Sequence, residues 1–253
     1  GDELIDRYVG ALIRELERVA ADLKPRTIFF GGGTPSLLNL RQWERIFRAM
    51  ERIPKSGAIE WTVECNPATV SIDKAKLLRA GGVNRVSLGV QSFDDALLDR
   101  LGRVHSRQMI FESFDILRQS GFDNVNLDLM FAIPGQTLEV WRETLAEAAA
   151  MGSEHLSTYE VIYEEDTPLY DQLQAGKVDV DEDLACAMYE ELVESAANAG
   201  FQQYEVANFA RPATINSQPS NIDVPSRCCL HNVNYWRGGG FYGLGPSATT
   251  YVR

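Results

Sequence analysis

The sequence predicts an α/β protein built on a parallel sheet. Short apolar runs rich in β-branched and aromatic residues alternate with longer segments whose apolar residues recur at helical spacing. With 253 residues, of which 45% are hydrophobic, the chain can bury one large core. Strands and helices that alternate in this way form right-handed strand–helix–strand units, so we expect a sheet that is either barrel-like or doubly wound.

The individual elements follow in order along the chain. Apolar residues from Ile5 to Leu23 recur every three or four positions and predict an amphipathic N-terminal helix. The predicted strands are Thr27–Phe30, Ile59–Glu64, Arg85–Val90, Asn124–Phe131 and His155–Ile162. The predicted helices between them are Leu40–Met50, a helix from the N-cap Ser71 to Gly81 and Gly82, Asp94–Leu101, Gln108–Ser120 and Thr137–Met151. Units of this kind normally begin with a strand, so a chain that opens with a helix lacks the first one.

Beyond residue 163 the alternation ends. Asp181–Ala199 predicts one more helix. Residues Arg211–Arg227 are rich in proline, serine and asparagine and predict a loop. The chain then ends in a segment dense in aromatic residues and glycine.

Composition excludes several classes of protein. The net charge of −12 repels phosphate backbones, so we expect no nucleic-acid partner. No apolar run is long enough for a transmembrane helix, and the acidic start does not match a signal peptide, so we expect a cytoplasmic protein. The four cysteines contain no C-x₂-C or C-x₃-C pair, which predicts reduced thiols rather than a zinc or iron–sulfur cassette.

Three consecutive glycines follow the first predicted strand in the segment TIFFGGGTPS. Gly31, Gly32 and Gly33 permit positive φ angles and let a ligand approach the main chain. Their N–H groups, with the Thr34 hydroxyl, can meet a polar or anionic group of a small molecule. This is not the dinucleotide motif G-x-G-x-x-G, because Thr34 and Pro35 replace the last glycine. The alternative is a strand-to-helix turn without a ligand.

Polar residues stand where the predicted strands end, which is where parallel α/β folds bind ligands. Glu64 ends the second strand, Gln91 follows the third, and Asp128 lies inside the fourth. A carboxylate in a buried strand needs a partner, and a ribose diol, an ammonium group or an arginine such as Arg103 would serve. The alternative for each residue is a buried hydrogen bond or ion pair within the protein.

Five motifs occur in a fixed order along the chain: GGGTPS, VECNP around Glu64, GVQSFDD around Gln91, RLGRVHS around Arg103 and NLDLMFAIPGQT around Asp128. Together they resemble the radical S-adenosylmethionine (SAM) family, in the branch that contains the oxygen-independent coproporphyrinogen III oxidase HemN and the heme chaperone HemW. The resemblance runs from residue 1 to residue 251. The segment HNVNYW, from His231 to Trp236, is similar to an element of the HemW branch and favours that branch.

The resemblance implies a partial (β/α)₆ barrel that holds SAM and a [4Fe–4S] cluster. Its core would be residues 1–163, and residues 164–253 would complete the barrel and add a family-specific extension. The residues that it implies for SAM are Gly32, Gly33, Thr34, Glu64, Gln91, Arg103, Asp128, Ile162 and Thr249. For heme, His231 would be the axial ligand, with Tyr235 and Trp236 against the porphyrin. The alternative for His231 is a hydrogen-bonded structural residue.

One departure from the family pattern concerns the cluster. Family members carry a CxxxCxxC cassette just before the helix with which this chain opens, and none of the four cysteines has that spacing. We therefore expect a chain truncated at its N-terminus, which by itself holds no cluster and does not cleave SAM, whereas the full-length protein binds both. The smaller domain that commonly follows in the family is also missing.

Three functions are compatible with these residues. The first is a HemW-type chaperone that holds heme and passes it to acceptor proteins. The second is a coproporphyrinogen III oxidase that decarboxylates porphyrinogen propionates by radical chemistry. The third is a barrel enzyme of another class that uses Glu64 and Asp128 as an acid–base pair; the family motifs make this third function remote.

Overall fold

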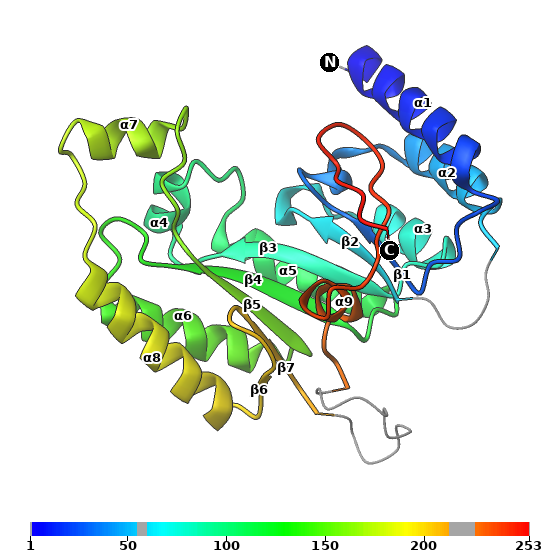
Figure 1. The fold of residues 1–253 in the computed structure, drawn as a ribbon. Coiled ribbons are helices and arrows are strands. Elements are labelled where there is room, and N and C mark those ends of the chain that lie inside the picture. Colours follow the sequence, from blue (N-terminus) through cyan, green and yellow to red (C-terminus); the bar gives the residue numbers. More distant parts are fainter. Residues whose placement is uncertain (1, 55–59, 213–225, 253) are drawn as a thin grey trace.

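The computed structural model describes residues 2–54, 60–212 and 226–252, and a seven-stranded sheet forms its centre (Figure 1). The strands are β1 (Thr27–Phe30), β2 (Glu60–Cys65), β3 (Arg85–Gln91), β4 (Val125–Phe131), β5 (His155–Glu160), β6 (Gln202–Gln203) and β7 (Asn208–Ala210). Strands β1 to β5 are parallel and lie side by side in chain order, and β7 joins β5 antiparallel. A doubly wound sheet would reverse its strand order at a switch point. The observed order is that of an open, partial barrel, which confirms the predicted fold class.

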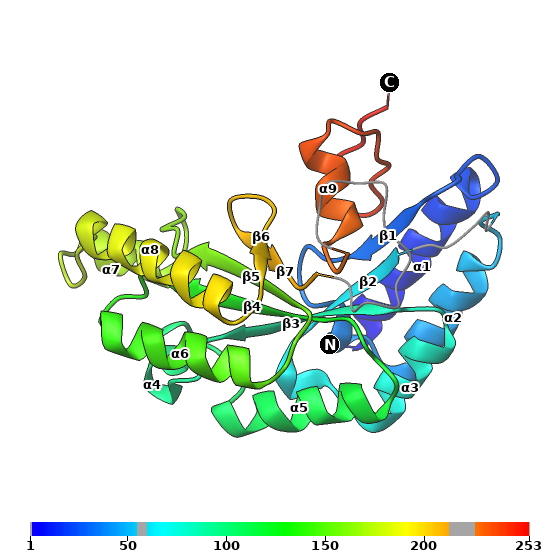
Figure 2. The same cartoon turned by 90° about the horizontal axis from the view of Figure 1, so that it is seen from below.

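Helices cover one face of this sheet, while the last helix lies against the other face (Figure 2). The helices are α1 (Asp2–Val19), α2 (Leu40–Met50), α3 (Ile72–Ala80), α4 (Asp95–Arg100), α5 (Arg107–Gln119), α6 (Leu138–Ala150), α7 (Pro168–Gln174), α8 (Glu182–Asn198) and α9 (Leu230–Trp236). Helices α2, α3, α5 and α6 pack on the outer face, and α8 packs on α6. Helix α9 is the element on the opposite side, which we call the inner face.

The two faces of the sheet differ in chemistry because side chains alternate along each strand. In β3, Val86, Leu88 and Val90 belong to the apolar core beneath the helices and are fully buried. The intervening residue Ser87 instead bonds to Asp128 on the inner face. The polar side chains of the inner face are Glu60, Thr62, Glu64, Arg85, Ser87, Asn126, Asp128, His155, Ser157 and Asn208. The inner face is therefore a polar wall rather than a second apolar core.

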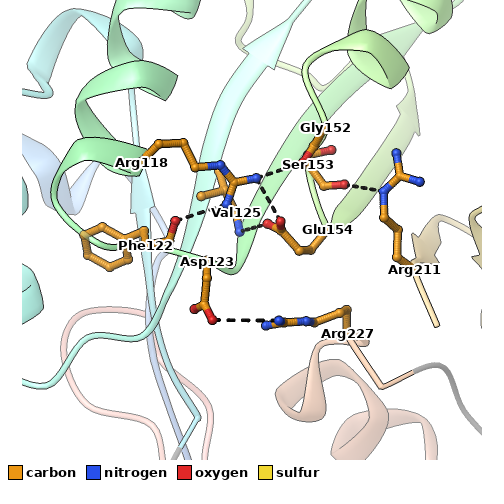
Figure 3. Close-up of polar contacts among 9 residues, drawn as sticks. All are labelled: Arg118, Phe122, Asp123, Val125, Gly152, Ser153, Glu154, Arg211 and Arg227. Atoms are coloured by element: carbon orange, nitrogen blue, oxygen red, sulfur yellow. Dashed lines mark hydrogen bonds and ion pairs between the residues drawn. The ribbon is translucent and has the colours of Figure 1, made fainter. Parts of the chain in front are cut away.

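A polar cluster fastens the N-terminal ends of β4 and β5 (Figure 3). The Arg118 guanidinium donates to the Gly152 carbonyl and to the Glu154 carboxylate, each at 2.8 Å. The other Glu154 oxygen accepts the backbone N–H of Val125, the first residue of β4, at 2.9 Å. Arg211 adds a 2.8 Å bond to the Ser153 carbonyl from the end of β7. This cluster joins three elements at the end of the sheet away from the glycine loop.

Most predicted elements are present, with strand ends within two residues of the prediction. The first helix ends at Val19, so the apolar pattern that reaches Leu23 extends past it into a turn. The predicted strand start at Ile59 lies outside the described residues, as do residues 213–225 of the predicted loop. The sequence analysis missed α7, α9, β6 and β7. Among the described residues, no helix has the length and apolarity that a bilayer crossing requires.

Candidate functional site

The glycine loop, residues 31–34, packs directly over the carboxyl group of Glu64. A Cβ atom at Gly31 would lie 2.8 Å from that carboxyl group and 2.5 Å from the Phe29 ring. Gly32 has a φ of 79°, a left-handed conformation that favours glycine, and its backbone hydrogen-bonds to Glu64. A Cβ atom at Gly33 would meet nothing within 4 Å. The loop is therefore packed against Glu64 at Gly31 and faces free space at Gly33.

Glu64 and Asp128 form an acidic pair on the inner face. Burial and, to a lesser extent, the charge of Asp128 raise the pKa of Glu64 to about 7, against the opposing effect of the bond from Gly32. Burial also raises the pKa of Asp128 to about 6, against hydrogen bonds from Ser87 and Asn126 and the charge of Arg85. A cation placed between the two carboxylates would favour the ionised form of each. The pair therefore suits the positively charged group of a small molecule.

Asp128 is held by hydrogen bonds within the sheet. Ser87 Oγ donates to Oδ2 at 2.9 Å, and Asn126 Nδ2 donates to Oδ1 at 2.8 Å. The sequence analysis named Arg103 as a partner, and the structure places Arg103 in an exposed loop within electrostatic range of Asp128. Arg85, a buried residue of the same inner face, supplies the charge that lowers the pKa of Asp128. Asp128 thus has partners of its own and lies near two arginines.

A second set of bonds positions the glycine loop. Ser36, fully buried in the short 3₁₀ helix Pro35–Leu37, accepts from the backbone of Asn66 at 3.0 Å and from the Thr69 hydroxyl at 2.6 Å. The Lys74 ammonium donates to the Ser36 carbonyl and, at 2.9 Å, to the Thr69 carbonyl. These bonds tie the segment after β1 to the segment after β2, so the loop and Glu64 keep a fixed relative position.

Gln91 lies at the C-terminal end of β3 in a strained conformation. Its φ of 65° is unusual for a residue other than glycine, and the β3–β4 register shifts between Gly89 and Gln91. A Cβ atom at Gly89 would lie 3.0 Å from Gln91 Nε2, so the side chain folds back over Gly89. Such strain persists where the surroundings hold it, often beside a bound ligand. Ile162, 74% exposed, lies just past β5 at the same edge of the sheet.

The structure does not bring all the predicted site residues together. Thr249 lies in the segment that follows α9, and this segment is attached to α1 by a 3.0 Å bond from the Gly245 N–H to Glu15. Among the described contacts, none joins Thr249 to Glu64 or Asp128. His231 lies at the N-terminal end of β1, where its Nδ1 is 2.9 Å from the hydroxyl of Thr27, the first residue of the strand. The start of α9 and the glycine loop therefore lie at the two ends of the four-residue strand β1, with Phe29 between them.

Helix α9 carries His231, Tyr235 and Trp236 across the N-terminal ends of β1 and β2 (Figure 1). The His231 ring stacks on Phe29 with centroids 4.9 Å apart, and burial lowers its pKa. Glu60, the first residue of β2, accepts the N–H groups of Leu230 and His231 at 2.9 and 3.0 Å. Tyr235 and Trp236 are 46% and 64% exposed. The helix thus presents two aromatic rings to solvent beside a half-buried, neutral histidine.

Comparison with known proteins identifies the family. A model of the radical SAM superfamily matches residues 4–148, which is more than half of the chain. The chain belongs to the radical SAM superfamily. It is 37% identical to the heme chaperone HemW of Bacillus subtilis over 98% of this chain and 64% of that protein. It is 35% identical to HemW of Escherichia coli over 96% of this chain and 61% of that protein.

A solved structure agrees with this assignment to the radical SAM superfamily. The coproporphyrinogen III oxidase HemN of Escherichia coli, described as a radical SAM enzyme, superposes with a TM-score of 0.73 and 26% identity. The superposition covers 83% of this chain and 49% of HemN. The chain thus spans less than two thirds of the curated HemW proteins named above and about half of HemN.

The described residues fit SAM, but they do not fit a [4Fe–4S] cluster. The acidic pair beside an open glycine loop suits a cationic nucleoside such as SAM. For the cluster, the described parts of the chain contain no group of three or more histidine, cysteine, aspartate or glutamate side chains arranged to hold a metal ion. We therefore assign no cluster ligand to these residues.

Several residues of the site were missed from the sequence. Asn126 lies two positions before Asp128, so the period of two along a strand places both on the same face, and Ser87 pairs with Asn126 across β3 and β4. Polar residues at alternate positions of a buried strand are the signal that could have identified them. Ser36 and Lys74 gave no comparable signal, because their bonds depend on how two turns pack together.

Proposed function

We propose that the protein is a HemW-type heme chaperone that binds SAM at the C-terminal edge of its sheet, binds heme at α9 and delivers heme to acceptor proteins. The identity of 35–37% to proteins named HemW over nearly the whole chain supports this assignment. The observation that carries SAM binding is the acidic pair of Glu64 and Asp128 beside the open backbone of Gly33.

The groups of SAM match the side chains at this edge. SAM carries positive charge, a carboxylate and a ribose diol. Glu64 and Asp128 would accept hydrogen bonds from its ammonium and hydroxyl groups, and Arg103 would pair with its carboxylate. The N–H groups of the glycine loop and the Thr34 hydroxyl would contact the methionine end. When bound with a cluster, SAM supplies the radical chemistry of the superfamily, and the residues named here bind and orient it.

The environment of His231 supports a role as an iron ligand. A metal-bound histidine usually bonds through its second ring nitrogen to a neighbouring group, which fixes the ring. His231 Nδ1 has such a partner in Thr27 Oγ1. Burial and the charge of Arg85 lower the pKa of His231, which favours the neutral imidazole that metals require. Tyr235 and Trp236 lie on the same helix and offer aromatic surface for a porphyrin.

Calorimetry tests the SAM site in the full-length protein. Asp128→Asn is expected to weaken SAM binding by about 1–3 kcal/mol, because a buried charged hydrogen-bond partner is lost. Asp123→Asn is the matched control, since Asp123 is exposed and lies two residues before the first residue of β4. Equal affinities for wild type, Asp128→Asn and Asp123→Asn would contradict the assignment of Asp128.

Hemin titration tests the second site. We expect a Soret shift in the wild type that is lost in His231→Ala and kept in Leu230→Ala, a substitution on the same helix. An unchanged shift in His231→Ala would remove His231 from the heme site and leave it as a residue that anchors α9.

The structural likeness to HemN favours a second candidate function, coproporphyrinogen III oxidase. An anaerobically reconstituted full-length protein separates the two candidates. Decarboxylation of coproporphyrinogen III would support the oxidase. A loaded cluster and intact SAM binding without turnover would support the chaperone.

A further inference from the structure

A continuous line of hydrogen bonds on the inner face joins Asp128 to the start of α9. Asn126 Nδ2 donates to Asp128 at 2.8 Å, and Asn126 Oδ1 lies 2.5 Å from His155 Nδ1. His155 Nε2 lies 2.7 Å from the Tyr204 hydroxyl. That hydroxyl in turn accepts the backbone N–H of Cys229, the N-cap residue of α9, at 3.1 Å. These bonds form one continuous hydrogen-bond chain, which runs through β4, β5, the β6–β7 connection and the N-cap of α9.

The direction of every bond in this chain is determined. The amide NH₂ of Asn126 faces a carboxylate, so its oxygen must face His155. His155 Nδ1 therefore donates, and the neutral ring leaves Nε2 as an acceptor for the Tyr204 O–H. The Tyr204 oxygen is then the acceptor for Cys229. Reversing any one bond would require reversing the others.

The surroundings keep this arrangement in one protonation state. His155 is fully buried, and burial together with the charge of Arg85 lowers its pKa well below the usual value. Asn126 is 1% exposed, so water does not compete for its bonds. Hydrogen bonds in series within a poorly solvated interior polarise one another. The chain of hydrogen bonds therefore gives a physical route from Asp128 to the first turn of α9.

We propose that His155 and Tyr204 are positioning residues that couple the cofactor pocket to α9, so that a ligand bound at Asp128 stabilises the helix that carries His231. This inference rests on the proposed function, since it takes SAM as the ligand. Coupling of this kind is a free energy shared by two sites and acts in both directions.

Hydrogen exchange of the α9 amides in the reconstituted full-length protein tests the coupling. In the wild type, saturating SAM is expected to slow exchange in residues 230–236 by about fivefold or more, the lower end of typical coupling. Tyr204→Phe is expected to bind SAM with an affinity within about threefold of the wild type, yet to lose the slowing. A residue with a merely structural role would raise exchange equally with and without SAM.

Tyr189→Phe is the matched control. The Tyr189 hydroxyl bonds to the Val206 carbonyl and to Gln203, so it contacts the same β6–β7 connection without belonging to the chain. This variant is expected to retain the full SAM response. Loss of the response in both variants would overturn the proposal, because it would show a general loosening of the connection.

A second measurement requires no substitution. In the wild type, the ¹⁵N resonances of the His155 ring are expected to shift when SAM binds, because the Asn126 and Tyr204 bonds change in strength. SAM binding without a change at His155 or α9 would overturn this inference alone. Absence of SAM binding to the wild type would overturn the proposed function and this inference with it.

Discussion

Gly31 determines where the Glu64 carboxyl group lies. A side chain at this position would occupy the space that the carboxyl group and the Phe29 ring now fill. Gly33, two residues later, faces open space. One glycine is therefore required by the protein itself, and the other leaves room for a ligand.

Gly31→Ala and Gly33→Ala separate these two roles. Gly31→Ala is expected to lower the free energy of unfolding by about 1–3 kcal/mol, because the new methyl group overpacks the site. Gly33→Ala is expected to leave the unfolding midpoint unchanged and to weaken SAM binding, because the methyl group projects into the ligand's space. Chemical denaturation and calorimetry measure the two effects. Equal destabilisation by both substitutions would contradict the distinction.

Glu64 makes folding stability depend on pH. Its pKa in the folded protein is about 7, above the ordinary value of 4.5, so the folded state binds the proton more tightly than the unfolded state. Stability is then greatest below the unfolded pKa and falls as pH rises to about 7. Glu64→Gln is expected to flatten this fall, whereas Glu44→Gln, at an exposed position, preserves it. Denaturation at a series of pH values measures the slope, and a steep fall retained in Glu64→Gln would contradict the assignment.

At the scale of elements, the cluster of Figure 3 holds β4 and β5 in register at their N-terminal ends. Arg118 and Glu154 are 28% and 18% exposed, so water screens their interaction only partly. The Arg118 guanidinium also lies 4.6 Å from the centre of the Phe114 ring. One side chain thus joins α5, the start of β4 and the loop before β5.

Arg118→Met is expected to lower the free energy of unfolding by about 1–3 kcal/mol, because the stem is kept while several partly buried hydrogen bonds are lost. Arg142→Met is the matched control, since it breaks an ion pair with Glu191 at the more exposed surface. We expect the control to leave the denaturation midpoint unchanged. A similar loss in the two variants would show that burial does not decide the strength of these pairs.

The elements were predictable to different degrees. Strands β1 to β5 carry strong apolar runs, and their polar ends pointed to Glu64, Gln91 and Asp128. Helix α7 has only seven residues and none of them is fully buried, so its apolar pattern is too short to recognise in the sequence. Helix α9 is capped by Glu60 from β2, and its own N-cap side chain makes no capping bond. A cap supplied by a distant strand leaves no local pattern.

At the scale of the whole molecule, the glycine loop follows the last residue of β1, and the start of α9 lies beside the first residue of the same strand. The four residues of β1 span roughly 13 Å, and Phe29 within this strand stacks on the His231 ring and also lies against Gly31. The positions of Thr249 and His231 depend on contacts between remote parts of the chain, which the sequence does not reveal. Alternation of strands and helices predicts the barrel, but it does not predict what lies against the inner face.

The two ends of β1 lead to the prediction that SAM and heme bind at the same time. Hemin titrated into the full-length protein at saturating SAM is expected to give a full Soret shift, since SAM is proposed at the end of β1 that carries the glycine loop and heme at the end that contacts α9. Coupling through His155 would change the hemin affinity without displacing the ligand. Competitive displacement of hemin by SAM, seen as a Soret signal that disappears with added SAM, would contradict two separate sites.

The partners that hold α9 lie far earlier in the sequence, so α9 can pack in place only late in synthesis. His231 bonds to Thr27 across 204 positions of the chain, and Leu230 bonds to Glu60 across 170. A ribosome adds residues at about 5–20 per second, so β1 and β2 emerge on the order of ten seconds or more before the helix that covers them. During that interval the polar inner face is open to water, which solvates it at little cost. A nascent chain with an apolar inner face would instead expose an aggregation-prone hydrophobic surface for the same period. The polar inner face therefore lets α9 arrive long after β1 and β2 without exposing the growing chain to aggregation.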